Sequence, residues 1–559
     1  MIMLENFSFG NFKAFGETQT LPIRPVTLVF GPNSTGKSSI IHALLLARHA
    51  LEGGELDATE TSIGGKAVDL GGFRQYVHRR EGGRRVELAA TLDVAELGPE
   101  LRKRLGGARS LTVSVQIGLS QKEGTRLQRD FDKEGNKVLV SVPTGELIPT
   151  GLPFVQSFEL LADGRSLFRM SRRPDGLLRM DRLESDHPAF RTTLEAILLS
   201  STTTEALSER DWDSLKVSIS DLVPELAARA RGLLPEGLAD SGRALAGASG
   251  SSITPVAPGD REVTLSNALR TFFPRLLDEL IRGTRQAFAS RLSHLQYLGP
   301  YRSFPPRFFS GMQSTEPDWF AGGGDAWNTL LTNESVRRDV NRWLGSEFMQ
   351  TRYELQVRSY ANIEQVEYPI MQLLEPMETP EEELDVDSRD SHLIVELLRR
   401  SDIDKREDLV LVDLRTNTPV SHRDVGFGVS QVLPVLVRAF GAEGSIQAME
   451  QPEIHLHPAL QAELGDVFLR SALQRGNTFL LETHSEHLIL RVMRRLRETF
   501  SKTLPHDLPP VTPAQVAVLY VEPGPNGSIV REMPLNERGE LVKAWPGGFF
   551  EEGLREVLS

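Results

Sequence analysis

The feature that most constrains this chain is a glycine-rich segment at residues 31–39, GPNSTGKSS, which fits the pattern G-x-x-x-x-G-K-[ST]. In this pattern the glycines let the backbone curl so that successive N–H groups face phosphate oxygens, and a lysine and a hydroxyl complete the site. The segment therefore predicts binding of a nucleoside triphosphate together with Mg²⁺. The candidate residues for binding ATP are Asn33, Ser34, Thr35, Gly36, Lys37, Ser38 and Ser39.

The residues on both sides of this segment support the same prediction. PVTLVFG, at residues 25–31, is a short apolar run typical of a buried parallel strand. The run that follows, SIIHALLLARHALE, predicts a helix whose N-terminal end favours bound anions. Strand, loop and helix in this order predict an α/β P-loop fold, and they disfavour the alternative of a glycine-rich turn without a ligand.

Composition indicates a globular protein with two or three compact units, since 559 residues exceed the usual size of one domain and 40% are hydrophobic. No apolar run approaches the roughly 20 residues of a membrane helix, and the N-terminus lacks the order of a secretory signal. We therefore expect a cytoplasmic protein that does not enter a membrane. The absence of cysteine excludes disulfides and cysteine-based zinc sites, and the net charge of −13 disfavours coating of nucleic acid by bulk charge.

The pattern along the chain predicts three parts. Residues 1–185 are expected to form an N-terminal ATPase lobe that includes an antiparallel β subdomain, because residues 86–168 contain several stretches of alternating polarity. Residues 186–295 are interpreted as a short helical arm with a mobile loop at about 237–260, and the lack of a heptad array argues against a long coiled coil. Residues 296–559 complete the fold as a C-terminal lobe.

The C-terminal part contains the second half of the expected site. Residues 445–458, SIQAMEQPEIHLHP, form an apolar strand that ends in polar residues. In P-loop enzymes an acidic side chain at such a strand end holds the Mg²⁺ shell and a following residue positions the attacking water, and Glu450 and Gln451 occupy these places. A further strand at 478–481 precedes His484, which can face a γ-phosphate, and RDVGFGVSQVLPVLVRAF places a glycine-rich turn before an apolar helix.

Together these motifs resemble the ABC-type ATPase heads of the SMC, RecF and overcoming-lysogenization-defect (OLD-like) group. The phrases VDLGGFRQYVH, YLGPYRSFPPR, VGFGVSQVLPVL, EQPEIHLHP, THSEHLILR and WPGGFFEE are similar to those of ATPases in bacterial anti-phage systems such as Septu and retron systems. The resemblance implies a two-lobed head in which the phosphate loop and the acidic strand end lie far apart in the chain. It also implies heads that close face to face around two ATP molecules, and therefore a homodimer or higher homo-oligomer.

The resemblance implies roles for individual residues. Lys13 and Phe15 would lie near the adenine, and His457 would lie near the D-loop. The expected metal ligands are Ser38, Gln75 from the Q-loop and Glu450. The expected catalytic residues are Glu450, Gln451, Glu453 and the switch histidine His484. The expected signature, which touches the nucleotide of a partner head, consists of Gly426, Gly428, Ser430 and Gln431.

Several residues also have a plainer interpretation. Gln75 could equally be a surface loop residue, and Arg302 could contact nucleotide or brace a returning strand. His455 and His457 could belong to a metal site, but no third ligand has clear spacing and the start of a helix explains them better. The acidic run at residues 375–390 is interpreted as a solvated loop, because its carboxylates lack the ordered spacing of a metal site.

The chain departs from the group that it resembles at the acidic strand end, where Glu450 and Gln451 stand in place of the usual Asp-Glu. A neutral Gln451 cannot accept a proton as a general base would, so we expect firm ATP binding and slow hydrolysis. Gln451 can still orient water, and Glu453 or His484 can share the task.

The expected function is ATP-dependent dimerisation by a sensor or regulatory scaffold for a separate effector, a nuclease or toxin, in anti-phage defence. The residues after His484 show no spaced carboxylate set that would hold two metals, so no nuclease domain is expected in this chain. One alternative is a RecF-like clamp that binds duplex DNA through a local basic face, since 63 lysines and arginines are available. Another is a structural scaffold with a degenerate ATP site.

Overall fold

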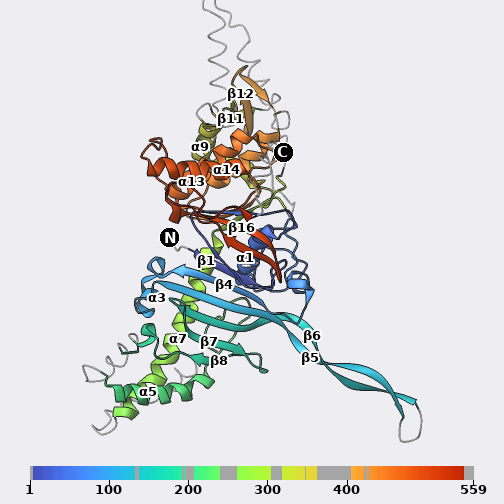
Figure 1. Cartoon of the computed structure of the whole chain (residues 1–559), viewed down its shortest axis with the longest axis vertical. Helices are drawn as coiled ribbons and strands as arrows, with labels where there is room; N and C mark the ends of the chain where they lie inside the picture. Colours follow the sequence, from blue (N-terminus) through green and yellow to red (C-terminus); the bar gives the residue numbers. More distant parts are fainter. Residues whose placement is uncertain are drawn as a thin grey trace, which may run out of the picture.

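The computed structural model contains three β-sheets and the helices that pack on them, which confirms a mixed α/β fold (Figure 1). The predicted acidic loop at 375–390, and residues 240–260 of the predicted mobile loop, lie outside the described part of the chain. The structure describes residues 4–131, 137–191, 194–195, 207–239, 261–303, 318–345, 348–361, 405–420, 425 and 427–546.

The central sheet has six strands in the order β10-β14-β15-β3-β16-β17. All neighbours are parallel except β17, which pairs antiparallel with β16 at the edge. The strands are β3 (Val26–Phe30), β10 (Leu295–Leu298), β14 (Ile446–Glu450), β15 (Thr478–Glu482), β16 (Val516–Gly524) and β17 (Gly527–Glu532). Strands β3, β14 and β15 are buried at every residue, which explains their continuous apolar sequences.

Helices cover both faces of this sheet, and the side chains of β3 divide between them. Val29 belongs to the core cluster that includes residues of α1, whereas Leu28 and Phe30 belong to the cluster that includes residues of α12, α13 and α14. This division follows the alternation of side chains along a strand. The helices are α1 (Lys37–Glu52), α12 (Phe427–Phe440), α13 (Pro458–Arg475) and α14 (Glu486–Phe500).

The second sheet has eight antiparallel strands in the order β2-β1-β4-β5-β6-β7-β8-β9, which confirms the predicted β subdomain. Its strands are β1 (Leu4–Gly10), β2 (Gln19–Pro22), β4 (Val86–Asp93), β5 (Ser110–Phe131), β6 (Lys137–Ala162), β7 (Arg165–Arg172), β8 (Leu178–Leu183) and β9 (Ala227–Ala228). Residues 122–126, KEGTR, have a composition that predicts a turn, and this prediction is wrong: these residues continue β5, with a register shift between Glu123 and Thr125 that accommodates Gly124. Strands β5 and β6 extend together beyond the rest of the sheet (Figure 1).

The remaining elements are helical or belong to a small sheet. In the region predicted as an arm, α5 (Glu209–Leu222) and α7 (Arg261–Ser293) pack together; the shortness of that arm and the absence of a long coiled coil stay predictions. The other helices and strands are α2 (Phe73–Tyr76), α3 (Pro99–Arg104), α8 (Asp325–Thr332), α9 (Glu334–Leu344), β11 (Tyr353–Ala361), β12 (Lys405–Asp413) and β13 (Thr418–Val420). A search of the described helices found none with both the length and the apolar character needed to span a bilayer.

The predicted boundaries at residues 185 and 295 stay predictions, but the sheets do not follow them. Strand β3 comes from the first part of the chain and pairs on both sides with strands from the last part, β15 and β16. Since these strands are parallel, their carboxyl ends meet at one edge of the sheet. The phosphate loop after β3 therefore lies beside the residues that end β14 and β15.

Candidate functional site

The phosphate loop connects β3 to α1, as the sequence predicted. Gly31 and Gly36 both have positive φ, +146° and +91°. A β-carbon on Gly31 would collide with the backbone oxygen of Val521, and one on Gly36 would collide with the side chain of Ala14. The two fixed glycines of the pattern are therefore required by the backbone and by its close neighbours.

Lys37 is the first residue of α1 and is only 5% exposed. Its Nζ donates a hydrogen bond to the backbone oxygen of Pro32 at 2.9 Å, and the hydroxyl of Thr35 donates to the same oxygen at 2.9 Å. Burial lowers the pKa of Lys37. Asn33 and Ser34 are exposed at the tip of the loop, so the loop is preformed around its lysine while its tip is open to solvent.

Two glutamates end the neighbouring strands β14 and β15. Glu450 and Glu482 are partners in the parallel register, and both lie on the face of the sheet that carries α1, because Ala448 and Leu480 two residues earlier belong to the α1 cluster. The carboxylate of Glu482 is hydrogen-bonded to the side chain of Ser38. Burial, and then the charge of Glu450, raise the pKa of Glu482 to about 7.

Sequence reasoning missed Glu482 because it ended the strand at Leu481, one residue too early. The signal was present: FLLE at 479–482 has the same form as QAME at 447–450, an apolar strand that ends in glutamate. The two glutamates therefore form a pair that only the pairing of the strands reveals.

Glu450 belongs to a chain of polar contacts. Its Oε1 accepts a hydrogen bond from the Tyr297 hydroxyl at 2.9 Å and lies 3.3 Å from Nε2 of His42. Nδ1 of His42 lies 2.7 Å from Nζ of Lys13. Burial lowers the pKa of His42 and lowers that of Lys13 to about 8. Sequence reasoning missed His42, which lies one helical turn after Ser38 on α1, and Tyr297 on β10.

The loops after β14 and β15 contact one another. The backbone N–H of Gln451 donates to the backbone oxygen of Glu482 at 2.7 Å, and Gln451 has a φ of +45°. Oε1 of Glu453 accepts a hydrogen bond from the backbone N–H of His484 at 2.8 Å, and burial raises the pKa of Glu453. His484 has its pKa lowered by burial and by the charge of Lys37, so its ring lies near the phosphate loop. Glu453 thus positions the backbone of His484.

Three of the four expected signature residues lie in the described part of the chain, and two of them are buried. Gly428 lies at the start of α12, close to the backbone oxygen of His455, and Gly426 lies outside the described residues. Ser430 and Gln431 are only 4% and 6% exposed, so they are buried within their own chain. Contact between the signature and a partner's nucleotide stays a prediction.

Gln75 is exposed on α2. It lines a pocket of about 480 Å³ with Lys13, Asp69 and Arg79, and this lining includes neither Ser38 nor the glutamates. A role of Gln75 as a metal ligand stays a prediction.

His457 and Arg302 have the structural roles given above as the plainer interpretations, at the start of a helix and as a brace for a strand. Nδ1 of His457 accepts a hydrogen bond from the N–H of Ala459 at 3.3 Å, which makes His457 the N-cap of α13. Arg302 is buried and donates to the backbone oxygen of Glu450 at 3.2 Å, so it braces the end of β14. Among the described residues, no three histidine or acidic side chains lie together in an arrangement that could hold a metal ion.

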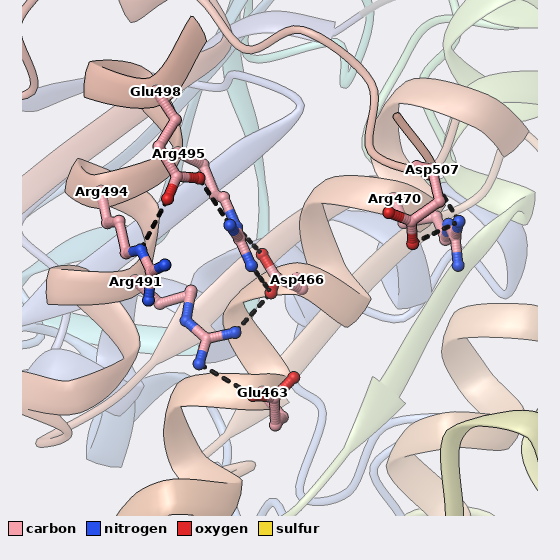
Figure 2. Close-up of polar contacts among 8 residues, drawn as sticks. All are labelled: Glu463, Asp466, Arg470, Arg491, Arg494, Arg495, Glu498 and Asp507. Carbon is pink, nitrogen blue, oxygen red and sulfur yellow. Dashed lines mark hydrogen bonds and ion pairs between the residues drawn. The ribbon is translucent and has the colours of Figure 1, made fainter. Parts of the chain in front are cut away.

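An ion network joins the helices that follow the two loops, α13 and α14 (Figure 2). The side chain of Asp466 is only 3% exposed. Its carboxylate accepts hydrogen bonds from Nε and Nη2 of Arg495, at 2.7 and 2.6 Å, and a further hydrogen bond from Arg491. Arg491 also donates to Glu463 at 2.8 Å, and Arg495 also pairs with Glu498. The network therefore fixes α13 and α14 to each other.

The raised pKa of Glu482 predicts how stability depends on pH in nucleotide-free protein kept in a metal chelator. Folded protein holds this proton more tightly than unfolded protein, so the free energy of unfolding falls as pH rises from about 4.5 to about 7. Glu482→Gln removes the ionisation. At pH 8 its free energy of unfolding is expected to be about 2–3 kcal/mol higher than that of the natural protein. Calorimetric melting of both proteins from pH 5 to 8 measures this; a difference that does not grow with pH would contradict it.

Part of the C-terminal half of the chain matches a known family of domains. Residues 320–491 match the family model described as "AAA domain, putative AbiEii toxin, Type IV TA system", and this region contains Glu450 and His484. A 48-residue segment, 8% of the chain, is 46% identical to the "Chromosome partition protein Smc" of Synechococcus sp. and covers 4% of that protein, so the chain spans only a small part of that relative.

Solved SMC head structures are similar to this chain. It resembles the Smc head domain derived from Pyrococcus furiosus, with an extended coiled coil and bound to the C-terminal domain of ScpA, at 10% identity, 100% and 99% coverage of the two chains and a TM-score of 0.34. It resembles the SMC head domain from Thermotoga maritima at 8% identity, 95% and 99% coverage and a TM-score of 0.31.

Proposed function

We propose that this chain binds ATP with Mg²⁺ at the carboxyl edge of its central sheet and dimerises around the nucleotide as an ABC-type ATPase head. The observation that carries the proposal is the convergence of Lys37, Ser38, Glu450 and Glu482 at one edge, although they come from segments far apart in the chain. The match of residues 320–491 to an AAA domain supports it independently.

The residues present suit a triphosphate and its metal. The amine of Lys37 would exchange its bond with Pro32 for phosphate oxygens, and the N-terminus of α1 favours the same anion. Ser38 and a carboxylate at this edge of the sheet would hold Mg²⁺, and Oε2 of Glu482 is buried without a hydrogen-bond partner in the described structure. Bound Mg²⁺ neutralises charge on the β- and γ-phosphate oxygens. His484, near Lys37, would face the γ-phosphate.

Hydrolysis is proposed to be slow because Gln451 stands where a general base is expected. In sedimentation velocity, ATP and Mg²⁺ are expected to convert monomer to dimer, and the dimer is expected to persist. Gln451→Glu is expected to raise the rate of phosphate release roughly tenfold or more and to shorten the lifetime of the dimer correspondingly. Dimers that do not depend on ATP, or rapid hydrolysis that Gln451→Ala leaves unchanged, would contradict the proposal.

The proposed biological role is that of a sensor or regulatory scaffold for a separate effector, a nuclease or toxin, in anti-phage defence. The support is the likeness of the motifs around Gln75, Arg302, Glu450 and His484 to those of defence ATPases. Affinity purification of the full chain from its native host, with and without phage infection, tests this. Recovery of a stoichiometric nuclease or toxin is the expected result.

A second candidate, binding of duplex DNA, is favoured by a basic pocket of about 650 Å³ on the antiparallel sheet. Its lining includes Arg85, Arg169, Arg172 and Arg173 and no carboxylate. Phosphate contacts made by such a surface weaken steeply with salt. Anisotropy of a labelled duplex at low and physiological salt distinguishes this candidate from a head that binds only proteins.

A further inference from the structure

The two glutamates at the site are not equivalent in their distance from the phosphate loop. Strand β15, which ends in Glu482, lies directly beside β3, whereas β14, which ends in Glu450, lies one strand further away. Neighbouring strands are about 4.8 Å apart. Glu482 is accordingly the carboxylate that reaches the hydroxyl of Ser38, the residue that the phosphate-loop pattern assigns to Mg²⁺.

Glu450 already has protein partners at one of its carboxylate oxygens. Its Oε1 interacts with both Tyr297 on β10 and His42, one helical turn beyond Ser38. The contact between Lys13 and Nδ1 of His42 leaves Nε2 of that ring as the N–H that faces Glu450. Oε1 of Glu450 is therefore already satisfied by two protein donors, Tyr297 and His42.

Glu482 has the opposite character. The residue is 5% exposed, and its Oε2 is buried with no hydrogen-bond partner among the described residues. A buried carboxylate oxygen without a partner costs free energy, and here the like charge of Glu450 lies on the next strand in register. A divalent cation between Ser38, Glu482 and phosphate oxygens would satisfy that oxygen, since Mg²⁺ is usually bound by one or two carboxylates together with substrate phosphates.

We infer that Glu482, and not Glu450, is the protein carboxylate that holds the Mg²⁺ of bound ATP, while Glu450 anchors a polar chain that ends at Lys13. This inference rests on the proposed function, because it requires that the site bind ATP with Mg²⁺. It moves the metal role from the strand end that sequence reasoning chose to the neighbouring one.

The test measures how much Mg²⁺ strengthens nucleotide binding. A fluorescent ATP analogue is titrated into full-length protein in a metal chelator and in Mg²⁺, for the natural sequence and for the matched variants Glu482→Gln and Glu450→Gln. Glu482→Gln is expected to lose roughly 10–100-fold of the benefit from Mg²⁺ and to keep its affinity in chelator, which also shows that it is folded. Glu450→Gln is expected to retain that benefit to within about threefold. Electron paramagnetic resonance of Mn²⁺ with ADP should show the same contrast.

The outcomes separate the inference from the proposed function. Retention of the Mg²⁺ benefit and of the Mn²⁺ signal by Glu482→Gln, or an equal loss in both variants, would overturn the assignment while leaving ATP binding established. Absence of nucleotide binding by the natural protein would overturn the proposed function and the assignment with it.

Discussion

Lys37→Ala is expected to weaken ATP binding by roughly 10- to 100-fold, the loss of a charge-assisted contact to phosphate. The amine is 5% exposed and its hydrogen bond in the structure is to the backbone oxygen of Pro32, so a phosphate can replace that partner without breaking an ion pair. ATP-dependent dimerisation should be lost at the same nucleotide concentration. Titration of a fluorescent ATP analogue measures the affinity, and sedimentation velocity measures the dimer.

The matched control for this variant is Lys103→Ala. Lys103 is exposed on α3, which belongs with the antiparallel sheet and not with the phosphate loop (Figure 1). It removes the same charge from the protein and should leave affinity unchanged. If Lys37→Ala binds the analogue as tightly as Lys103→Ala does, the loop does not bind phosphate and the proposed function is wrong.

Asp466→Ala is expected to destabilise the C-terminal core by about 3 kcal/mol. The carboxylate of Asp466 is the shared partner of Arg491 and Arg495, and Arg495 is itself only 8% exposed (Figure 2). Removing the carboxylate leaves two guanidinium groups in a buried place with fewer partners. Urea unfolding followed by tryptophan fluorescence measures the change, since Trp327 and Trp343 are buried in the same core cluster as residues of α13 and α14.

The matched control for Asp466→Ala is Asp507→Ala, which breaks a more exposed ion pair. Asp507 pairs with Arg470 at 3.3 Å, but its side chain is 44% exposed (Figure 2). Solvent screens such a pair, so its loss should change the free energy of unfolding by no more than about 1 kcal/mol. Equal effects of the two substitutions would show that the network around Asp466 contributes no more than a surface ion pair.

The sequence predicted the local parts of the site well. The strand β3, the loop and α1 follow one another directly, and β14 and β15 are short apolar runs, so each could be recognised from its own residues, although the end of β15 was placed one residue too early. The start of a helix beside His457 was also expected, and α13 begins at the next residue, Pro458. These features depend on neighbours in the chain, which the sequence displays.

What the sequence could not provide is the pairing of distant segments. The residues of β16 have the apolar character of a buried strand, but nothing in them indicates that this strand lies directly beside β3. The same limitation hid the pair of Glu450 and Glu482, which depends on the register of β14 against β15. His42 was hidden in a different way, because a single histidine in an apolar helix is ordinarily a core residue, and only its spacing of four from Ser38 places both on one helical face.

The position of β3 also determines when the site can form during synthesis. Its neighbours begin at Thr478 and Val516, and the turn at Gly31 packs against Val521. Chains emerge from the ribosome N-terminus first, so the phosphate loop is translated early and its two flanking strands arrive late. The phosphate site of a growing chain is consequently incomplete until residue 521 has left the ribosome. The proposed binding of ATP therefore requires that β3, β15 and β16 have all been synthesised and have paired.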